Sequence, residues 1–582
     1  MTKKKFLLIM AAFLIVFTAA LCVCCKASKR IPLKDGEWTG KAEGRNGPIE
    51  LVLSVKNGKI SGARIVSESE TDFAKPAEET VIAQAVKLNR VDGLDSVSGA
   101  TITSKATMEA LANAMLKAQG KADNTSSAKT AEDVSCDIAV IGAGGAGLSA
   151  ATEAAGKGAK VIVLEKMGIA GGNTNAATGG LNASETSVQK SLGIADTNEQ
   201  YYQDTMKGGY NLNDPELVRN MVDTSAETVD WLISLGADLG DVGKMAGSTN
   251  RRTHRPKGGS AIGIHLVPVL QTAAEKASAE IRFNSKVTDI ARNGSRFAVS
   301  VSSGAGDYTV NAKAVIIATG GFGANSDMVV QYKPDLAGFG TTNHKGATGD
   351  AFEWVKKFNA TLVQMEQIQT HPTVVPGNGV MITEAVRGNG AVMVNREGKR
   401  FNNEMATRDI MSAAILRQTG KTSFLLFDQG IRESLKAIEG YARQGLLTQA
   451  DTIAGLAEKL GIPAAALEET IISYNKIQAS GNDTEFGRAG SDMPRAISTA
   501  PYYAVEVGPA VHHTMGGIKI NTDAEVIDTS GKVISGLFAA GEVTGGVHGG
   551  NRLGGNAVAD ITIYGKIAAD SALSYINTLA QE

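Results

Sequence analysis

Cysteine is scarce in this sequence, and its distribution excludes two kinds of redox centre. The chain has 582 residues and four cysteines: Cys22, Cys24 and Cys25 share one apolar segment near the amino terminus, and Cys136 stands alone. An iron–sulfur cluster needs a set of cysteine ligands, and a c-type haem needs a C-x-x-C-H attachment site. The sequence contains neither pattern, so any redox chemistry must use organic cofactors.

The sequence also lacks an excess of either charge. Its 58 Lys and Arg nearly balance its 60 Asp and Glu, for a formal net charge of −2 at pH 7. Binding to nucleic acid requires a basic stripe that contacts phosphates, so we expect no nucleic-acid partner. A chain of this length exceeds what one hydrophobic core usually serves, and two or more folding units are expected.

Glycine, in contrast, is abundant. The chain has 67 Gly against 13 Pro, and the glycines lie mostly in short clusters between apolar runs. This distribution is typical of nucleotide-binding α/β proteins, in which the backbone must approach a ligand closely.

The amino terminus has the pattern of a targeting segment. Lys3, Lys4 and Lys5 precede an uncharged, mostly apolar stretch at 6–25, about the length of a membrane-spanning helix. We assign residues 1–30 to a signal or membrane anchor and expect an exported protein attached to the outer face of the cytoplasmic membrane. Because no good small-residue cleavage site follows, an uncleaved anchor is favoured, with lipidation at a cysteine and cleavage as alternatives.

Residues 31–120 are expected to form a small α+β unit. Residues 48–55 indicate a strand, Asn57-Gly58 a hairpin turn, and 59–66 a returning strand. A helix closes the unit, and its apolar face comprises Met108, Leu111, Ala112, Met115 and Leu116. The polar, aperiodic residues 121–134 are typical of a flexible linker.

From Cys136 onward, strands and helices alternate, which predicts a parallel sheet with crossover connections. Its first βαβ unit has a strand at 137–141, the glycine-rich turn 142–147, a helix, and a second strand at 160–164 that ends at Glu165. The glycines allow a tight turn and close approach of the backbone to a pyrophosphate. Glu165 lies where a carboxylate accepts hydrogen bonds from ribose hydroxyls. Strand, glycines, helix and acid in register favour a dinucleotide site over a purely structural turn.

This βαβ unit does not separate FAD from NAD, but four further segments do. Residues 171–174, 318–323, 346–350 and 540–542 resemble the flavin-contacting segments of the fumarate reductase and succinate dehydrogenase flavoprotein family. The resemblance implies an α/β fold, in which a Rossmann-like FAD-binding domain at 135–365 and 512–582 contains an inserted α+β capping, or clamp, domain at 366–511. It implies non-covalent FAD held by Gly142, Gly144, Gly145, Ala146, Gly147, Glu165, Lys166, Gly171, Gly172, Asn173, Thr174, Gly179, Gly180, Thr319, Gly320, Gly321, Gly349, Asp350, His513, Glu542, Leu553 and Gly554.

The resemblance extends to segments that would bind a dicarboxylate. Residues 370–373, 381–388, 406–409, 511–517 and 548–555 are similar to those of the soluble flavocytochrome c fumarate reductases. The resemblance implies that one substrate carboxylate is held by Arg552 and His512, and that the other is held by His371 and Thr383. It also places Met381 in the substrate site.

The chemistry explains why such residues would converge. Hydride adds to an unreactive C=C bond only if a conjugated carboxylate is polarised, so that arginine and histidine stabilise the developing negative charge. By resemblance, N5 of FAD delivers hydride and Arg408 protonates the neighbouring carbon. A guanidinium has a pKa above about 12 and needs its proton replaced at once. The family resemblance assigns that relay to Glu384 and Arg387.

A second flavin site is expected before the linker. Residues 95–104 resemble the attachment motif of FMN-binding domains, in which a flavin transferase joins the FMN phosphate to a threonine hydroxyl. By register the residue with covalent FMN is Thr103, and Thr101 is the alternative. Capping of the helix that follows is the ordinary role for such residues, and the two roles can coexist.

Together these features predict a fumarate reductase in which FMN relays electrons from an external donor to FAD. No second dinucleotide fingerprint is visible, so we expect a membrane-associated quinol or flavoprotein donor rather than NADH. Two alternatives stay open. One is reduction of another unsaturated carboxylate of the urocanate, acrylate or cinnamate type, and the other is a surface electron-transfer flavoprotein without catalysis.

Overall fold

The computed structural model describes residues 33–43, 48–68, 75–91, 94, 101–120, 131–377 and 379–579. The chain divides into two compact units, residues 1–127 and 128–582. The anchor expected at 1–30 lies outside the described residues. Within the described ranges, no helix is both long and apolar enough to cross a membrane.

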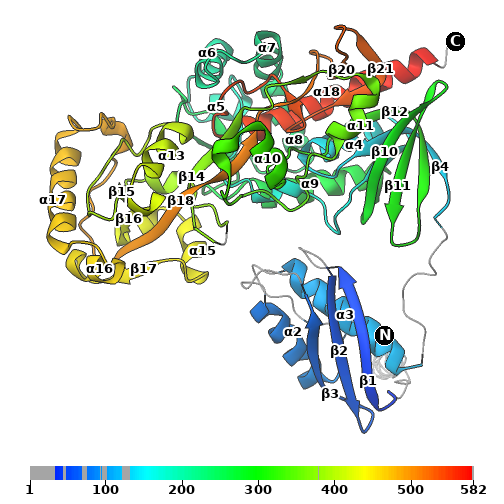
Figure 1. Ribbon diagram of the computed structural model, residues 1–582, viewed down its shortest axis with the longest axis horizontal. Coiled ribbons are helices and arrows are strands. Elements are labelled where there is room, and N and C mark those ends of the chain that lie inside the picture. Colours follow the sequence, from blue (N-terminus) through cyan, green and yellow to red (C-terminus); the bar gives the residue numbers. More distant parts are fainter. Residues whose placement is uncertain are drawn as a thin grey trace, which may run out of the picture. The chain divides into compact units, whose positions relative to one another are not determined.

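The small unit is a three-stranded antiparallel sheet covered by two helices (Figure 1). Asn57 and Gly58 turn between the last two strands with positive φ angles of 53° and 70°, as a two-residue hairpin turn requires. This confirms the hairpin predicted from the sequence. The elements are β1 (Gly36–Glu43), β2 (Pro48–Lys56), β3 (Lys59–Ser67), α2 (Lys75–Leu88) and α3 (Thr101–Ala118).

The face that α3 turns to the sheet differs from the one predicted. Leu111 is buried as expected, but the other fully buried apolar positions are alanines, whereas Met108 and Met115 are only partly buried at the edge of the core. The reason is the approach of α3 to Gly40 in β1. A Cβ added there would lie 1.9 Å from the Ala110 carbonyl oxygen and 2.7 Å from the Ala114 nitrogen. Only small residues fit this interface, so the apolar periodicity alone placed the face incorrectly.

The large unit is built on an eight-stranded sheet in the order β10-β11-β12-β4-β5-β9, with β21 beside β12 and β20 beside β21. Strands β12, β4, β5, β9 and β21 are parallel, as predicted, but β10, β11 and β12 form antiparallel hairpins. The alternating burial of β11, with Phe297, Val299 and Val301 inside, is typical of such strands. The strands are β4 (Val134–Ile141), β5 (Val161–Leu164), β9 (Glu280–Arg282), β10 (Ser285–Asn293), β11 (Arg296–Ser303), β12 (Tyr308–Ile317), β20 (Glu525–Ile527) and β21 (Val533–Ala539).

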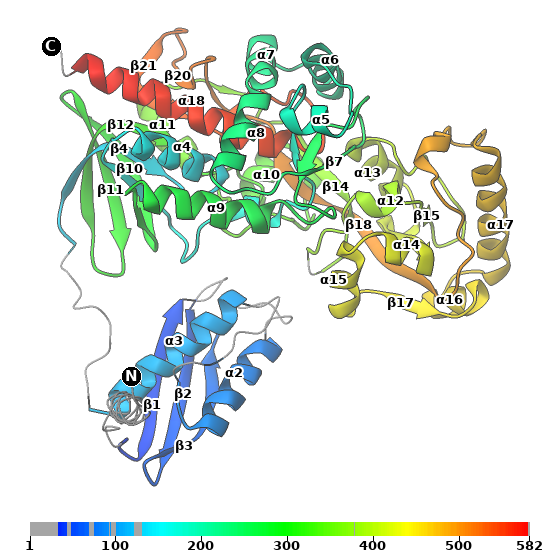
Figure 2. The ribbon, with the colours of Figure 1, turned by 180° about the vertical axis from the view of Figure 1, so that it is seen from behind.

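Helices cover this sheet, and the long α18 packs along α4 (Figure 2). A Cβ on Gly565 of α18 would lie 2.6 Å from the Ala146 carbonyl of α4, so glycine permits this close crossing. The helices are α4 (Gly145–Gly156), α5 (Ser187–Ser191), α6 (Asn198–Gly208), α7 (Pro215–Asp223), α8 (Ser225–Ser234), α9 (Gly263–Lys276), α10 (Ser326–Tyr332), α11 (Ala351–Val355) and α18 (Asn556–Leu579).

A second hydrophobic core lies between residues 382 and 507, around an antiparallel sheet in the order β14-β18-β16-β15 with β17 beside β18. Strand β18 joins the cores, because Tyr503 and Val507 belong to the second and Val511 to the first. The elements are β14 (Ile368–Val374), α12 (Ala385–Gly388), β15 (Val392–Val394), α13 (Arg408–Leu416), β16 (Ser423–Asp428), α14 (Gln429–Ser434), α15 (Ala437–Arg443), β17 (Thr448–Ala450), α16 (Ile453–Leu460), α17 (Ala464–Ser480) and β18 (Tyr502–Thr514).

Two small sheets complete the large unit. They are β6-β8-β7 and β13-β19-β22, formed by β6 (Leu181–Asn182), β7 (Asp241–Gly243), β8 (Thr253–Arg255), β13 (Leu362–Val363), β19 (Gly517–Lys519) and β22 (Thr544–Gly545).

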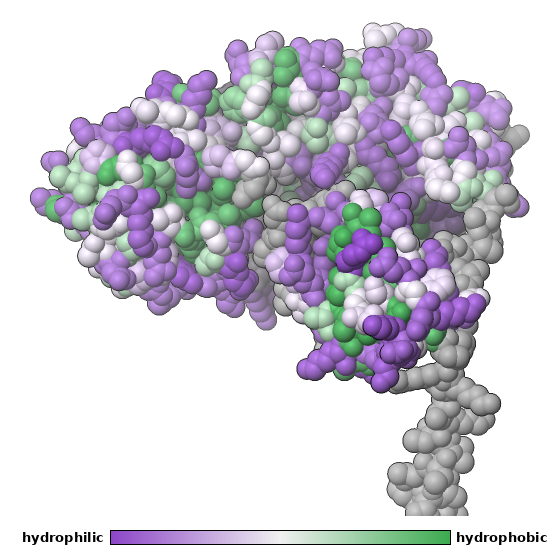
Figure 3. Space-filling view, turned by 60° about the horizontal axis from the view of Figure 1, so that its bottom comes forward, coloured by the Kyte–Doolittle hydropathy of each residue, from purple (hydrophilic) through white to green (hydrophobic). Residues whose placement is uncertain are grey.

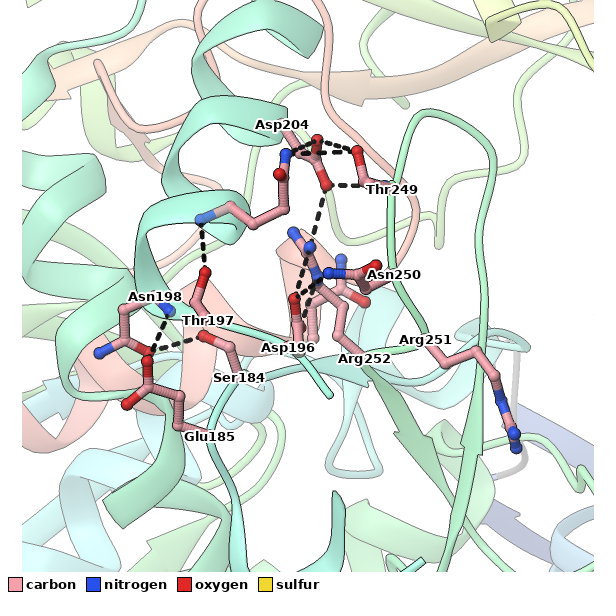
Figure 4. Close-up of polar contacts among 12 residues, drawn as sticks. Ser184, Glu185, Asp196, Thr197, Asn198, Asp204, Thr249, Asn250, Arg251 and Arg252 are labelled. Atoms are coloured by element: carbon pink, nitrogen blue, oxygen red, sulfur yellow. Dashed lines mark hydrogen bonds and ion pairs between the residues drawn. The ribbon is translucent and has the colours of Figure 1, made fainter. Parts of the chain in front are cut away.

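A buried ion-pair network supports the first of these sheets. Figure 4 shows Arg252 pointing to two aspartates, with Nε and Nη2 each 3.0 Å from Asp196 and Nη2 also 2.9 Å from Asp204. The next residue, Thr253, donates to Asn182 Oδ1 at 2.6 Å, and Asn182 Nδ2 donates to the Gly554 carbonyl at 2.8 Å. Removing one partner of such a buried pair typically costs about 3–5 kcal/mol. The network therefore fixes the backbone next to Arg552.

Hydrophilic side chains cover most of the face seen in Figure 3, with hydrophobic ones in separate patches. Among the large apolar side chains that the structure leaves exposed are Tyr210, Leu212 and Ile410.

We predict that Gly40→Ala destabilises the small unit by about 1–3 kcal/mol, because the added Cβ would overlap the α3 backbone. Hydrogen exchange of β1 to β3, measured by mass spectrometry, reports this change as faster exchange. Gly62→Ala in β3 is the matched control, since a Cβ there meets nothing within 4 Å. Equal protection in the two variants would contradict the packing argument.

Candidate functional site

A cleft of about 840 Å³, part of it open to solvent, lies at the carboxyl ends of β4, β5 and β12. This edge of a parallel sheet is where nucleotides bind in doubly wound folds. The lining residues are Ile141, Gly142, Gly144, Gly145, Ala146, Leu164, Glu165, Lys166, Met167, Gly171, Gly172, Asn173, Thr174, Ser285, Val287, Ala318, Thr319, Gly320, His344, Gly346, Ala347, Asp350, Trp354, Ala540, Glu542 and Ile561.

The backbone around this cleft fits a dinucleotide. Gly142 has a φ of 103°, and a Cβ there would lie 2.4 Å from the Ala318 carbonyl. A Cβ on Gly147 would lie 1.8 Å from the Gly142 carbonyl, so the turn and the first helical turn need glycine. Helix α4 begins at the cleft, and Gly144 before it provides no side-chain cap. The Gly145 N–H donates to Thr174 Oγ1 at 3.1 Å, so the N–H groups that follow it in the first turn are the ones that can meet a phosphate.

Glu165 lies at the end of β5 as predicted, and the structure adds a second role for it. Its carboxylate accepts the backbone N–H of Ala143 and of Met167, each at 2.8 Å. Burial raises the pKa of Glu165, although these hydrogen bonds oppose the shift. The residue thus holds the glycine-rich turn in place, while each carboxylate oxygen keeps a lone pair for a ribose hydroxyl.

A chain of charged groups lies where β14, α12 and α13 meet. Arg408 opens α13, and its Nε and Nη2 each lie 3.1 Å from Glu384 Oε2. The other carboxylate oxygen, Oε1, lies 4.0 Å from Arg387 Nη2 in α12. Burial alone would raise the pKa of Glu384, but the charges of Arg408 and Arg387 outweigh it and lower that pKa. The three residues predicted to form a relay are therefore adjacent in the order Arg387, Glu384, Arg408.

Gln369 connects this chain to Arg552. Its Oε1 accepts from Arg408 Nη1 at 3.2 Å and from Arg552 Nη2 at 3.4 Å, while its Nε2 donates to Asn551 Oδ1 at 2.6 Å. Sequence reasoning missed Gln369, although it stands two residues before His371. A buried glutamine in a strand has no sequence pattern that indicates a site residue, and its role is visible only when the fold brings its two arginine partners together.

Two imidazoles complete the cluster. The rings of His371 and His512 lie 5.1 Å apart, and His512 Nδ1 is 2.7 Å from Thr342 Oγ1. His371 Nε2 is buried and has no hydrogen-bond partner among the described residues. Burial, together with the charge of Arg408, holds the pKa of both histidines well below its usual value. Both are therefore neutral near pH 7, and each can donate one hydrogen bond to an anion.

Arg552 is a buried cation that forms no ion pair with a carboxylate of the residues described by the structure. Its guanidinium donates to the Leu553 carbonyl at 3.2 Å and to Gln369, and its Nε has no partner among the residues that the structure describes. Burial and the charge of Arg408 lower the pKa of Arg552 to about 9. Among the described residues, Glu384 has the only carboxylate within 4.0 Å of a guanidinium nitrogen of Arg387, Arg408 or Arg552. Because an unpaired buried charge costs several kcal/mol, the cluster favours a bound anion.

Comparisons with known proteins agree with an FAD-binding unit and an FMN-binding unit. A family model described as FAD binding domain matches residues 137–558, and one described as FMN-binding domain matches residues 44–116. The chain is 47% identical, over 79% of its length and 80% of the relative, to fumarate reductase (cytochrome) of Shewanella frigidimarina. It belongs to the FAD-dependent fumarate reductase flavoprotein family.

Other relatives widen the family. This flavoprotein is 32% identical to a urocanate reductase of Eggerthella lenta, over 92% of each chain. Its fold matches the solved open conformation of a flavocytochrome c3 fumarate reductase with a TM-score of 0.67 and 42% identity, covering 76% of this chain and 79% of that one. The chain is thus an FAD-binding oxidoreductase with an added FMN-binding domain.

Not every residue predicted to contact FAD lines the cleft of this flavoprotein. Gly147 and Gly180 instead allow backbone packing, and Gly321 lies beside Glu542. Those outside the lining are Gly147, Gly179, Gly180, Gly321, Gly349, His513, Leu553 and Gly554. His513 stacks edge-on against His548, which pairs with Asp560 of α18 at 3.2 Å.

Several lining residues were missed by sequence reasoning. Ser285 and Val287 belong to β10, Trp354 to α11 and Ile561 to α18. They carry no motif, because they come from elements far apart in the sequence that only the folded sheet brings to one edge.

The remaining predicted residues have simpler surroundings. Thr383 is buried, and its backbone N–H donates to the Tyr441 hydroxyl at 2.9 Å. Met381 is half-buried, and its backbone forms an isolated antiparallel β-bridge with Val374. In the FMN motif, residues 95–100 and the side chain of Thr101 lie outside the described residues. The side chain of Thr103 is buried in the first turn of α3, and its carbonyl accepts from Thr107 Oγ1 at 2.8 Å.

Proposed function

We propose that this protein reduces the carbon–carbon double bond of fumarate to give succinate. The observation that carries the proposal is the Arg387–Glu384–Arg408 series, in which the Glu384 carboxylate lies 3.1 Å from Arg408 and 4.0 Å from Arg387. Beside it is Arg552, which pairs with no carboxylate among the described residues. The identity to a fumarate reductase of Shewanella frigidimarina supports the same substrate.

The positive cluster and the two neutral imidazoles suit a dianion. We assign one carboxylate to Arg552 and His512, and the other to His371 and Thr383. Arg552 is buried and lacks a carboxylate partner, so it gains the most from this binding. A substrate with one carboxylate would leave one of the two groups unpaired.

Arg408 is the proton donor in this proposal. When bound, FAD supplies hydride and covalently attached FMN brings it electrons from an external donor. Arg408 gives one proton to the carbon next to the one that receives hydride, and Glu384 returns a proton to Arg408 across 3.1 Å. Arg387 then passes a proton to Glu384. Because the pKa of the Glu384 carboxyl is lowered, Glu384 passes this proton on rather than retaining it.

We further propose that residues 1–30 anchor the protein at the outer face of the cytoplasmic membrane. In this arrangement the donor is a membrane-associated quinol or flavoprotein system, and a flavin transferase attaches FMN. The uncharged stretch at 6–25 supports the proposal.

A substrate panel tests the function. The purified holoprotein oxidises a reduced dye in the presence of fumarate, and we expect fumarate to support a higher kcat/KM than urocanate or acrylate. The second candidate is reduction of another unsaturated acid, which the related urocanate reductase favours. Turnover with urocanate or acrylate but not fumarate would select that candidate, and absence of turnover with any acid would reject catalysis.

Arg408→Ala tests the proton donor. Loss of a general acid typically slows turnover by about 10²–10⁴-fold, so fumarate reduction should fall by that factor while FAD remains bound. Arg417→Ala is the control, because Arg417 is exposed at the other end of the same helix. Fumarate turnover of Arg408→Ala within a few-fold of the wild-type rate would refute the assignment.

Thr103→Val tests the FMN attachment. The variant should keep non-covalent FAD, but its denatured band should lose flavin fluorescence, because valine has no hydroxyl to form the phosphoester. Thr101→Val should keep the fluorescence. The reverse pattern would move the attachment to Thr101, and fluorescence in both variants would exclude both threonines.

A further inference from the structure

The loop between α6 and α7 has an unusual backbone. Tyr210 and Asn211 are consecutive non-glycine residues with positive φ angles, 59° and 55°. Such conformations are uncommon for residues with a side chain and persist where the surroundings hold them. Tyr210 is also 48% exposed, which is high for a large aromatic side chain. The end of α6 accounts for the backbone, because the Tyr210 N–H donates to the Lys207 carbonyl at 3.1 Å and the Asn211 N–H to the Met206 carbonyl at 2.8 Å. It does not account for the exposed aromatic ring of Tyr210.

One side of the loop is attached to the segment that carries Arg552. Asn551 Nδ2 donates to the Gly208 carbonyl at 3.1 Å, and the Gly550 N–H donates to the Gly209 carbonyl at 2.9 Å. A Cβ on Gly549 would lie 2.5 Å from the Gly209 carbonyl oxygen, so the two backbones are in close contact. The loop and the Arg552 segment therefore form one rigid piece.

The other side of the loop reaches the helix that carries Arg408. The Tyr210 hydroxyl donates to Asp409 Oδ2, and Asp409 directly follows Arg408 in the first turn of α13. Burial and the Asp409 carboxylate raise the pKa of Tyr210 to about 12, so the hydroxyl keeps its proton and remains a donor at neutral pH. A single side chain thus joins the elements that carry the two arginines.

This connection bears on the spacing of the two guanidinium groups. Arg408 and Arg552 repel each other and share only Gln369 Oε1, at 3.2 and 3.4 Å, as a common acceptor. Arg408 comes from the second core and Arg552 from the first, so a small shift between the cores would separate them. The Tyr210–Asp409 hydrogen bond opposes that shift at the residue next to Arg408.

We propose that Tyr210 is a positioning residue that keeps Arg408 at the distance from the Arg552 site that proton transfer requires. The proposal rests on the proposed function, in which Arg408 acts in the transition state. Loss of the hydroxyl therefore lowers kcat and leaves KM nearly unchanged, because the groups that hold the substrate carboxylates stay in place.

A double-mutant cycle tests this role. Tyr210→Phe and Asp409→Ala should each lower kcat roughly tenfold, the scale of one lost hydrogen bond. The double variant should be no slower than either single one, because both remove the same contact. Asp409→Asn keeps an acceptor oxygen and should lose less than about threefold. Tyr202→Phe is the matched control, since its ring in α6 stacks on Arg219, away from α13.

The rates are compared as ratios to wild type with whichever acid the wild type reduces, so the choice of substrate does not affect this outcome. Hydrogen exchange of residues 408–412 gives a readout that needs no turnover. It should accelerate in Tyr210→Phe and not in Tyr202→Phe. Additive effects on kcat, a raised KM with unchanged kcat, or unchanged exchange would each overturn the proposal.

Discussion

Repulsion among buried guanidinium groups is the constraint on which the rest of this site depends. Arg387, Arg408 and Arg552 lie in a volume from which water is largely excluded, and in the described part of the chain Glu384 is the one carboxylate within 4.0 Å of any of their guanidinium nitrogens. Like charges at low dielectric interact strongly, so the arrangement is unfavourable until an anion enters. Burial, together with the charges of Arg408 and Arg552, holds the pKa of His371 and His512 well below its usual value, which makes them donors to an anion rather than additional cations. In the proposed function, affinity for a dicarboxylate and readiness for proton transfer thus have one electrostatic origin.

The fold sustains this repulsion by attaching each arginine to a different rigid element. Arg552 lies just before Gly554, whose carbonyl is held by Asn182 beside the buried Arg252 network. Arg408 opens a helix packed on β14 and the second core. Strand β18 runs through both cores and carries His512 near its end. The arginines and His512 therefore lie close together although no single hydrophobic core has to bury all of them.

In each of the two units, some features were predicted correctly from the sequence and others were not, for physical reasons. The Asn57-Gly58 hairpin was predicted because a two-residue turn with positive φ has few solutions. The buried face of α3 was placed incorrectly, because the approach to Gly40 selects alanine over the larger apolar residues. In the large sheet the parallel strands were expected, but the antiparallel β10–β12 hairpins were not, since alternation of strands and helices elsewhere masked them.

The sequence by itself determined the identity of the chemical groups. The glycine-rich turn, Glu165 and the motifs around Arg408 and Arg552 follow local rules of backbone conformation and charge, which act over a few residues. Only the tertiary structure decided which of these groups touch. Gln369 between two arginines, Trp354 and Ile561 in the FAD cleft, and the Tyr210 contact to Asp409 all join residues distant in sequence. No local pattern encodes such contacts, because they depend on how elements far apart in the sequence pack against each other.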